Sequence, residues 1–133
     1  MGVVNEDITK DAAWYVGEDK VLTFTVYTPG TTQAMIDADP TLNRQNLTGY
    51  TLVWNLKKNR YAASVVLTKA TGGNGITLLA QSGATLGQFT VTIARADTTG
   101  LKAGTYAHAA ARTNAGNWDV VSEGAAVLQK AAA

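Results

Sequence analysis

The sequence of 133 residues contains no cysteine, one histidine and two prolines. The absence of cysteine excludes a disulfide scaffold, a thiolate metal site and a cysteine nucleophile. A single imidazole, His108, also argues against zinc, which requires three or four nitrogen or sulfur ligands. We therefore expect a fold held together by packing and backbone hydrogen bonds, without a metal or other cofactor.

Charge is scarce as well. Charged residues make up 16% of the chain, and 11 basic residues nearly balance 10 acidic ones, which leaves a net charge of +1. Such a balance creates no field that would attract nucleic acid or an anionic membrane. No signal-peptide pattern opens the chain, and no run of 18 apolar residues follows. We expect synthesis in a cytosol and neither nucleic acid nor membrane as a partner.

The scarcity of charge has two interpretations. One is a β domain whose outer faces are rich in threonine, because threonine suits a pleated surface. The other is a surface covered by partner proteins, because the centres of interfaces are depleted of charged residues. Composition does not choose between them.

No combination of residues predicts catalysis. His108 lies among alanines in a predicted strand, and no Gly-x-Ser-x-Gly motif accompanies it. The carboxylates cluster near the start and in one long loop, and nothing in the sequence makes a pair of them face each other. We interpret His108 as a structural residue, the carboxylates as solvated loop charges, and the protein as a non-enzyme.

Alternating apolar residues predict β-strands, because side chains on a strand point to opposite faces in turn. The clearest strands cover residues 21–27, 50–57 and 89–93, with Trp54 on the inner face of the second. Weaker runs are found at residues 64–69, 76–79, 106–112, 118–123 and 125–129. About seven strands separated by turns roughly every 8–12 residues predict an all-β, Ig-like, two-sheet antiparallel sandwich.

Turn residues separate these strands. The glycine-rich residues 70–75 predict a turn or hairpin, and residues 94–101 predict one helical turn ended by glycine. Gly124 is expected to break the chain between the last two strands. The predicted organisation is an N-terminal arm over residues 1–12, a sandwich over residues 13–129 and a loose tail over residues 130–133.

One connection is unusually long. Residues 28–46, here called the inserted loop, exceed the length of about 12–15 residues beyond which loops tend to be functional or disordered. A short helix is predicted over residues 32–38, ended by Pro40. The loop either packs Met35 and Ile36 back onto the edge of the sandwich or binds a partner.

Aromatic residues offer a second functional hypothesis. Trp14, Tyr27 and Trp118 have no assigned place in the core, and exposed aromatic rings on a β-sandwich can stack on sugars. A glycan-binding module built on these three residues is therefore the alternative to a protein-binding domain.

Four motifs occur in a fixed order along the chain. They are Gly17-Glu18-Asp19, Leu47-Thr48-Gly49-Tyr50, Thr98-Thr99-Gly100-Leu101-Lys102-Ala103-Gly104-Thr105-Tyr106 and Gly124-Ala125-Ala126-Val127. In this order, over residues 13–129, the chain resembles small structural domains of tailed phages, such as the N-terminal domain of upper baseplate proteins and related tail or neck accessory proteins. The inserted loop departs from that pattern, in which a brief turn is usual.

The resemblance implies a virion component that has no chemistry of its own. Such a subunit is assembled in the host cytoplasm, is present in several copies, and joins or decorates pieces of a capsid, neck, tail or baseplate through contacts with other virion proteins. The expected contact residues lie in the N-terminal arm and the inserted loop: Val3, Val4, Ile8, Met35, Ile36 and Leu42.

Overall fold

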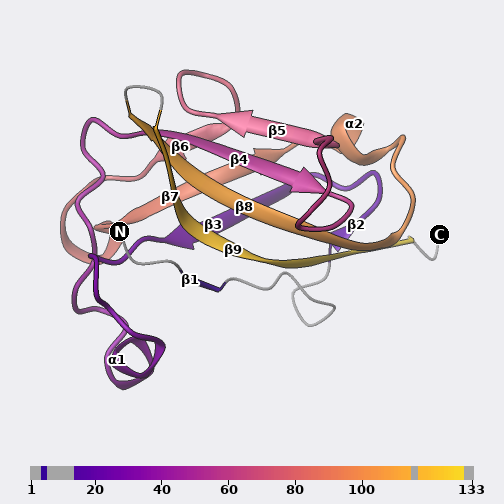
Figure 1. Ribbon diagram of the computed structural model, residues 1–133. Helices are drawn as coiled ribbons and strands as arrows, with labels where there is room; N and C mark the ends of the chain where they lie inside the picture. Colours follow the sequence, from indigo (N-terminus) through magenta and orange to yellow (C-terminus); the bar gives the residue numbers. More distant parts are fainter. Residues whose placement is uncertain (1–3, 6–13, 115–116, 131–133) are drawn as a thin grey trace.

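The computed structural model describes residues 4–5, 14–114 and 117–130, which fold mainly into β-strands (Figure 1). The strands are β1 (Val4–Asn5), β2 (Trp14–Tyr15), β3 (Lys20–Thr25), β4 (Thr51–Lys57), β5 (Leu67–Ala70), β6 (Ile76–Leu78), β7 (Gln88–Ile93), β8 (Gly104–Asn114) and β9 (Asn117–Gln129). Two short helices, α1 (Gln33–Ala38) and α2 (Arg95–Thr98), and a 3₁₀ turn at Gly83–Thr85 complete the described elements.

The strands form two sheets. Sheet A has the order β1-β9-β8-β4-β5, with β2 also paired to β9, and sheet B has the order β3-β7-β6. β1 and β2 run parallel to β9, and every other pair is antiparallel. The prediction of an all-β, two-sheet fold is confirmed.

The core lies between the sheets. The inward residues of β4 (Leu52, Trp54 and Leu56) and of β7 (Phe89, Val91 and Ile93) are all fully buried, as their alternation predicts. Leu22 and Phe24 of β3 join the same cluster. The strongest periodic signals in the sequence thus mark three strands that together supply eight of the 17 buried residues of the core cluster.

An aromatic cluster joins the two sheets at their centre. His108, on β8 in sheet A, is buried and accepts a hydrogen bond at Nδ1 from Nε1 of Trp54, 3.4 Å away. The ring of Phe24, on β3 in sheet B, lies 5.6 Å from the imidazole centroid. The single histidine is therefore enclosed by core side chains, which agrees with the structural role expected for it.

One local expectation is wrong, and another is met in one of its two forms. Gly124 does not break the chain, because it pairs with His108 in the ladder and β9 continues through it to Gln129. Residues 70–75 do form a turn, but not a hairpin, because β5 pairs with β4 in sheet A while β6 pairs with β7 in sheet B. The glycines of this turn carry the chain from one sheet to the other.

A β-bulge alters the β8–β9 hairpin. Ala110 pairs with Ser122 whereas Ala111 pairs with Val120, so Val121 is an extra residue on β9. Val121 and Ser122 are both buried, as expected where two residues of a bulged strand oppose one residue of its partner. The bulge keeps Val120 and Trp118 on the outer face while the remainder of β9 stays in register.

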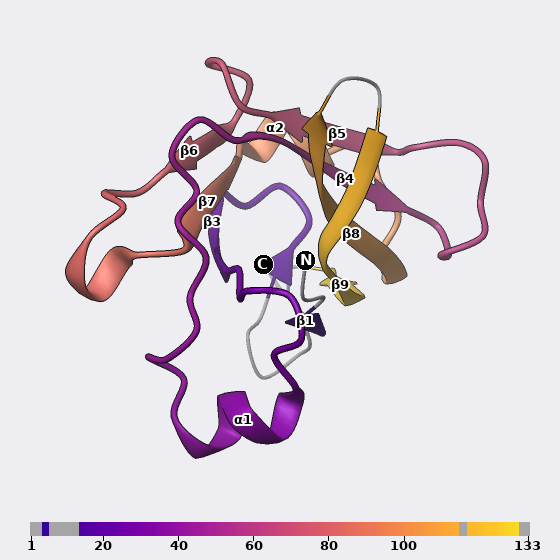
Figure 2. The ribbon, with the colours of Figure 1, turned by 60° about the vertical axis from the view of Figure 1, so that its left-hand side comes forward.

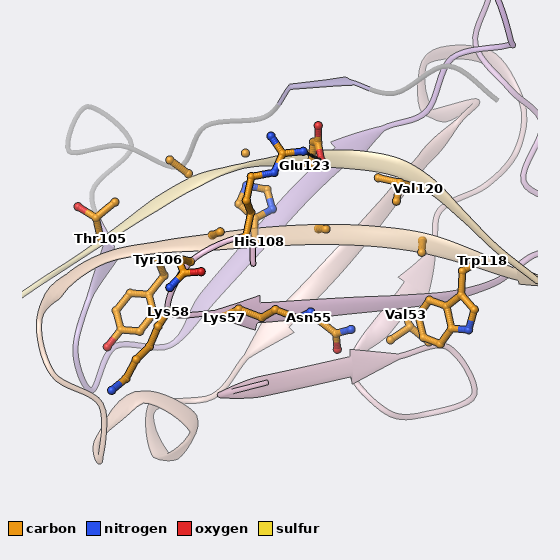
Figure 3. A pocket seen from close by; sticks show the side chains of 17 residues that line it. Val53, Asn55, Lys57, Lys58, Thr105, Tyr106, His108, Trp118, Val120 and Glu123 are labelled. Carbon is orange, nitrogen blue, oxygen red and sulfur yellow. Dashed lines mark ion pairs between the residues drawn. The ribbon is translucent and has the colours of Figure 1, made fainter. Parts of the chain in front are cut away.

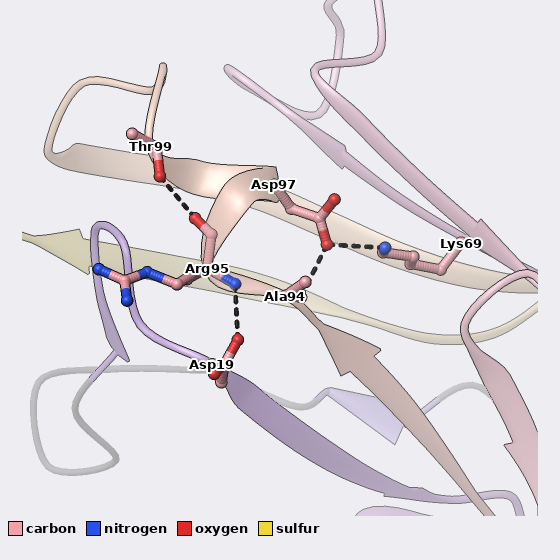
Figure 4. Close-up of polar contacts among 6 residues, drawn as sticks. All are labelled: Asp19, Lys69, Ala94, Arg95, Asp97 and Thr99. Atoms are coloured by element: carbon pink, nitrogen blue, oxygen red, sulfur yellow. Dashed lines mark hydrogen bonds and ion pairs between the residues drawn. The ribbon is translucent and has the colours of Figure 1, made fainter.

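The predicted helical turn after β7 is confirmed as α2, and Asp97 holds it in place (Figure 4). Asp97 Oδ2 accepts a hydrogen bond from the N–H of Ala94 at 2.8 Å and forms an ion pair with Nζ of Lys69 at 2.7 Å. The hydrogen bond from Lys69, helped by that from Ala94, lowers the pKa of Asp97 from its ordinary value of 3.8. The carboxylate therefore ties α2 to β5.

We expect Asp97→Asn to lower the free energy of unfolding at pH 7 by about 1–2 kcal/mol, because the ion pair and a charged helix cap are lost. Because the pKa of Asp97 is lower in the folded than in the unfolded state, the ionised carboxylate stabilises the fold above about pH 4. This stabilisation is lost as the pH falls through the folded-state pKa. The difference between wild type and variant should therefore shrink between pH 7 and pH 3 in urea titrations.

Asp37→Asn on the exposed helix α1 serves as the matched control and should change stability by less than about 0.5 kcal/mol at either pH. An Asp97→Asn deficit of equal size at both pH values would contradict a role for the ionised carboxylate.

Candidate functional site

The inserted loop is anchored firmly at its base. Tyr27 and Arg44 form a β-bridge, and the N–H groups of Thr28 and Gln45 donate to the carbonyls of Asn43 and Val26 at 2.8 and 2.9 Å. Arg44 reaches outward from this bridge, and its Nη1 donates to the carbonyl of Ala84 at 2.7 Å. The two ends of the loop are therefore fastened to each other and to the neighbouring turn.

Gln81 adds a second anchor that the sequence reasoning missed. Its Oε1 accepts hydrogen bonds from the N–H groups of Leu47 and Gly87 at 2.8 and 3.0 Å, and its Nε2 donates to the carbonyl of Leu79 at 2.8 Å. One amide side chain thus connects the end of the inserted loop with the segment that leads into β7. Nothing local in the sequence marks this glutamine as an anchor of the loop, because its partner Leu47 lies 34 residues away along the chain.

Beyond its base the loop projects away from the sandwich, as both ribbon views show (Figures 1 and 2). Helix α1 begins after Thr32, whose Oγ1 accepts from the N–H of Met35, and none of its six residues is buried. Met35 is 45% exposed and Leu42 is 57% exposed, while Ile36 is half-buried. The predicted helix is confirmed, but packing of Met35 onto the edge of the sandwich is contradicted.

The projecting part of the loop is acidic. Asp37 and Asp39 are its charged residues, and residues 29–43 contain no lysine or arginine. The hydroxyl and the N–H of Thr41 donate to Asp39 Oδ1 at 2.6 and 3.0 Å and hold the pKa of that carboxyl below its ordinary value. The tip therefore presents negative charge beside exposed apolar side chains at neutral pH.

A second feature lies on the outer face of sheet A (Figure 3). Three alanines alternate along β8 and point outward, at positions 107, 109 and 111, and they form the floor of a cavity of about 680 Å³, here called the alanine groove. Its other lining side chains include Val53, Asn55, Lys57, Lys58, Arg60, Trp118, Val120 and Glu123. Small side chains at the centre of the sheet and larger ones around them produce the hollow.

The groove is apolar at one end and basic at the other. Val53, Val120 and Trp118 gather at the first end, and Trp118 is 58% exposed (Figure 3). Lys57 and Lys58 lie towards the other end, and no ion pair within the described part of the chain engages either of them. Arg60 pairs with Glu123 at 3.6 Å, but both side chains are largely exposed, so this pair contributes little stability.

The structure separates the three residues of the predicted glycan platform. Trp14 and Tyr27 are buried, with 0% and 4% exposure, so neither can stack on a sugar, and their assignment to a platform is wrong. Trp14 packs into the core, while the hydroxyl of Tyr27 donates to the carbonyl of Pro40 in the inserted loop. Trp118 alone remains accessible, in the lining of the alanine groove.

The expected contact residues of the N-terminal arm fall outside this description. Val3 and Ile8 lie outside the described residues. Only the backbone of Val4 is described, and it lies in β1 and pairs with Ser122 of β9. The predicted boundaries at residues 1–12 and 130–133 fall largely in the same segments. The site is therefore built from the inserted loop and the alanine groove.

Neither a cluster of metal ligands nor a membrane-spanning helix is found in the part of the chain that the structure describes. Within residues 14–114 and 117–130, no three His, Asp or Glu side chains gather closely enough to hold a metal ion. The helices found there are too short to cross a bilayer. What these residues do offer is an acidic, apolar projection and a groove with an apolar and a basic end, both suited to non-covalent contacts.

Comparison with models of known protein families and with curated protein sequences found no match for this chain.

Proposed function

We propose that this chain is a non-enzymatic structural subunit of a tailed-phage particle that contacts other virion proteins through its inserted loop. It would serve as a capsid decoration, neck or tail and baseplate adaptor, assembled in the host cytoplasm. The observation that carries the proposal is that α1 buries none of its residues although the base of its loop is tightly anchored. A projection built in this way is suited to docking.

The energetics of the loop support this reading. An isolated helix of six residues is marginal in water, and most helical stability in proteins comes from packing of one face. The described residues bury no side chain of α1 fully, and they leave Met35 and Leu42 exposed. A partner that covers these two side chains would provide the missing burial.

The proposal includes an Ig-like sandwich. The order β3-β7-β6 corresponds to strands B-E-D of an immunoglobulin domain, and β9-β8-β4-β5 corresponds to G-F-C-C′. Trp54 occupies the place of the buried tryptophan on strand C, and the hydroxyl of Tyr106, near the start of β8, donates to the carbonyl of Lys102 as in a tyrosine corner. His108, two residues later, stands where such domains place a disulfide cysteine, and here it packs on Phe24.

Copurification tests the proposal. Wild-type chain should be present in purified phage particles by mass spectrometry, and Met35→Asp combined with Leu42→Asp should reduce its amount about tenfold or more, because two apolar contacts are lost. Val65→Asp is the matched control, since Val65 is also exposed but lies between β4 and β5, outside the inserted loop. Absence of the wild-type chain from particles would refute the proposal.

One observation favours the alternative of a glycan-binding module. Trp118 is accessible in a groove that also contains Asn55, Lys57 and Glu123, and an aromatic face beside polar groups suits a sugar ring. A glycan array should then show binding that Trp118→Ala abolishes and Tyr61→Ala, at another exposed aromatic residue, preserves. No binding by the wild-type chain would exclude this alternative.

A further inference from the structure

We propose that the inserted loop of one copy docks in the alanine groove of a second copy, so that the chain associates head to tail. This inference rests on the proposed function and names the partner of the inserted loop. The inserted loop and the alanine groove are separate surfaces of one chain. The hydrogen bonds of the loop within the described residues join it to Val26, Tyr27, Thr48 and Ala84 or to itself, and none reaches a residue of the groove.

Charge complementarity identifies the second copy as the occupant. The projecting residues 29–43 carry two acidic side chains and no basic one, whereas the groove is lined by Lys57, Lys58 and Arg60 with a single acid, Glu123. Asp39 stays ionised at neutral pH, because its hydrogen bonds from Thr41 lower its pKa. Opposite charges placed on two surfaces steer encounter and fix the orientation of docking.

Both surfaces also present apolar side chains. Met35 and Leu42 are exposed on the loop, and Val53, Val120 and Trp118 gather at the end of the groove away from the lysines (Figure 3). The floor of alanines allows a helix to approach the sheet closely, because no long side chain projects from the middle of β8. Tryptophan, enriched among residues that dominate binding energy, is the expected anchor.

The two surfaces differ from each other, so the contact is heterologous. A heterologous contact between identical copies closes into a ring when the rotation permits, and otherwise grows into a filament. Either product fits a subunit used in several copies within a particle. A closed two-fold dimer is not expected from a single contact of this type.

Cysteine cross-linking tests the contact directly, since the wild-type chain contains no cysteine. Met35→Cys protein is mixed with Val120→Cys protein and treated with a short bis-maleimide. We expect a cross-linked dimer whose yield rises with protein concentration and exceeds, by about tenfold, the yield from Met35→Cys mixed with Thr77→Cys, on the exposed face of β6. Equal yields from the two mixtures would overturn the proposal.

Charge reversal provides an independent test that a merely unfolded variant could not pass. Lys58→Asp should lower the cross-linking yield when introduced into the Val120→Cys protein, and Asp37→Lys in the Met35→Cys partner should restore it. The yield should also fall with added salt, because exposed charges are screened. Failure of Asp37→Lys to restore the yield would overturn head-to-tail docking. Binding to a glycan array that Trp118→Ala abolishes would also overturn it, because the groove would then hold a sugar.

The failure of this inference can be told apart from failure of the proposed function. If the chain copurifies with particles but does not cross-link above the control, the loop binds another virion protein and only this inference is wrong. If it cross-links but is absent from particles, self-association holds and the proposed function is wrong.

Discussion

Replacing Trp54 with alanine should lower the free energy of unfolding by about 3–5 kcal/mol, the range for removing a large aromatic side chain from a core. Trp54 is fully buried between the sheets, and the surrounding strands cannot close the cavity without breaking their ladders. The substitution also removes the hydrogen bond that Nε1 donates to Nδ1 of His108. Urea denaturation followed by circular dichroism measures the loss without depending on tryptophan fluorescence.

Trp118→Ala is the matched control, because it removes the same side chain from the surface. Trp118 is largely exposed, so its replacement should change stability by no more than about 0.5 kcal/mol. Similar losses for the two variants would contradict the placement of Trp54 at the centre of the core.

Gly87→Ala should cost about 2–4 kcal/mol, because strain and a steric clash act together. Gly87 has φ of 76°, a conformation that favours glycine, and an added Cβ would lie 2.9 Å from the carbonyl oxygen of Val26 and 3.1 Å from that of Gln45. Both neighbours are backbone atoms at the base of the inserted loop and cannot move aside like a flexible side chain. Thermal or urea unfolding measures the effect.

Gly49→Ala separates strain from clash. Gly49 has φ of 79°, but an added Cβ would meet no atom within 4 Å, so only the conformational cost of about 1 kcal/mol applies. If the two alanine variants were equally stable, the close packing of Gly87 against the loop base would be refuted.

Most of the strands could be predicted from the sequence because their signal is local. Leu22 and Phe24 are separated by a threonine, as are Phe89 and Val91, and burial of one face demands this period. The helix in the inserted loop was also predictable, since Thr32 caps its first turn and Pro40 follows its end. The error in the strand prediction fell at a glycine. Gly124 marks a break in the sequence pattern, yet it pairs across the ladder with His108.

The candidate site was less predictable for a physical reason. Met35 and Leu42 could be named from their place in a long loop, but their exposure depends on the anchoring of that loop by Arg44 and Tyr27. Trp14 and Trp118 look alike in the sequence, and one lies in the core while the other lies in the groove. The outward alanines of β8 were a usable signal, because β-branched residues would be usual on a solvent-facing strand.

The sequence by itself determined that this is a cysteine-free, all-β chain with alternating core strands and one long loop that contains a short helix. These features could be predicted because periodicity and turn chemistry act between near neighbours along the chain. Only the tertiary structure decided which strands share a sheet, where the bulge at Val121 turns β9, and which aromatic rings stay exposed. These features depend on pairing between segments distant in sequence. The alanine groove combines side chains from β4, β8 and β9, and no local pattern encodes that combination.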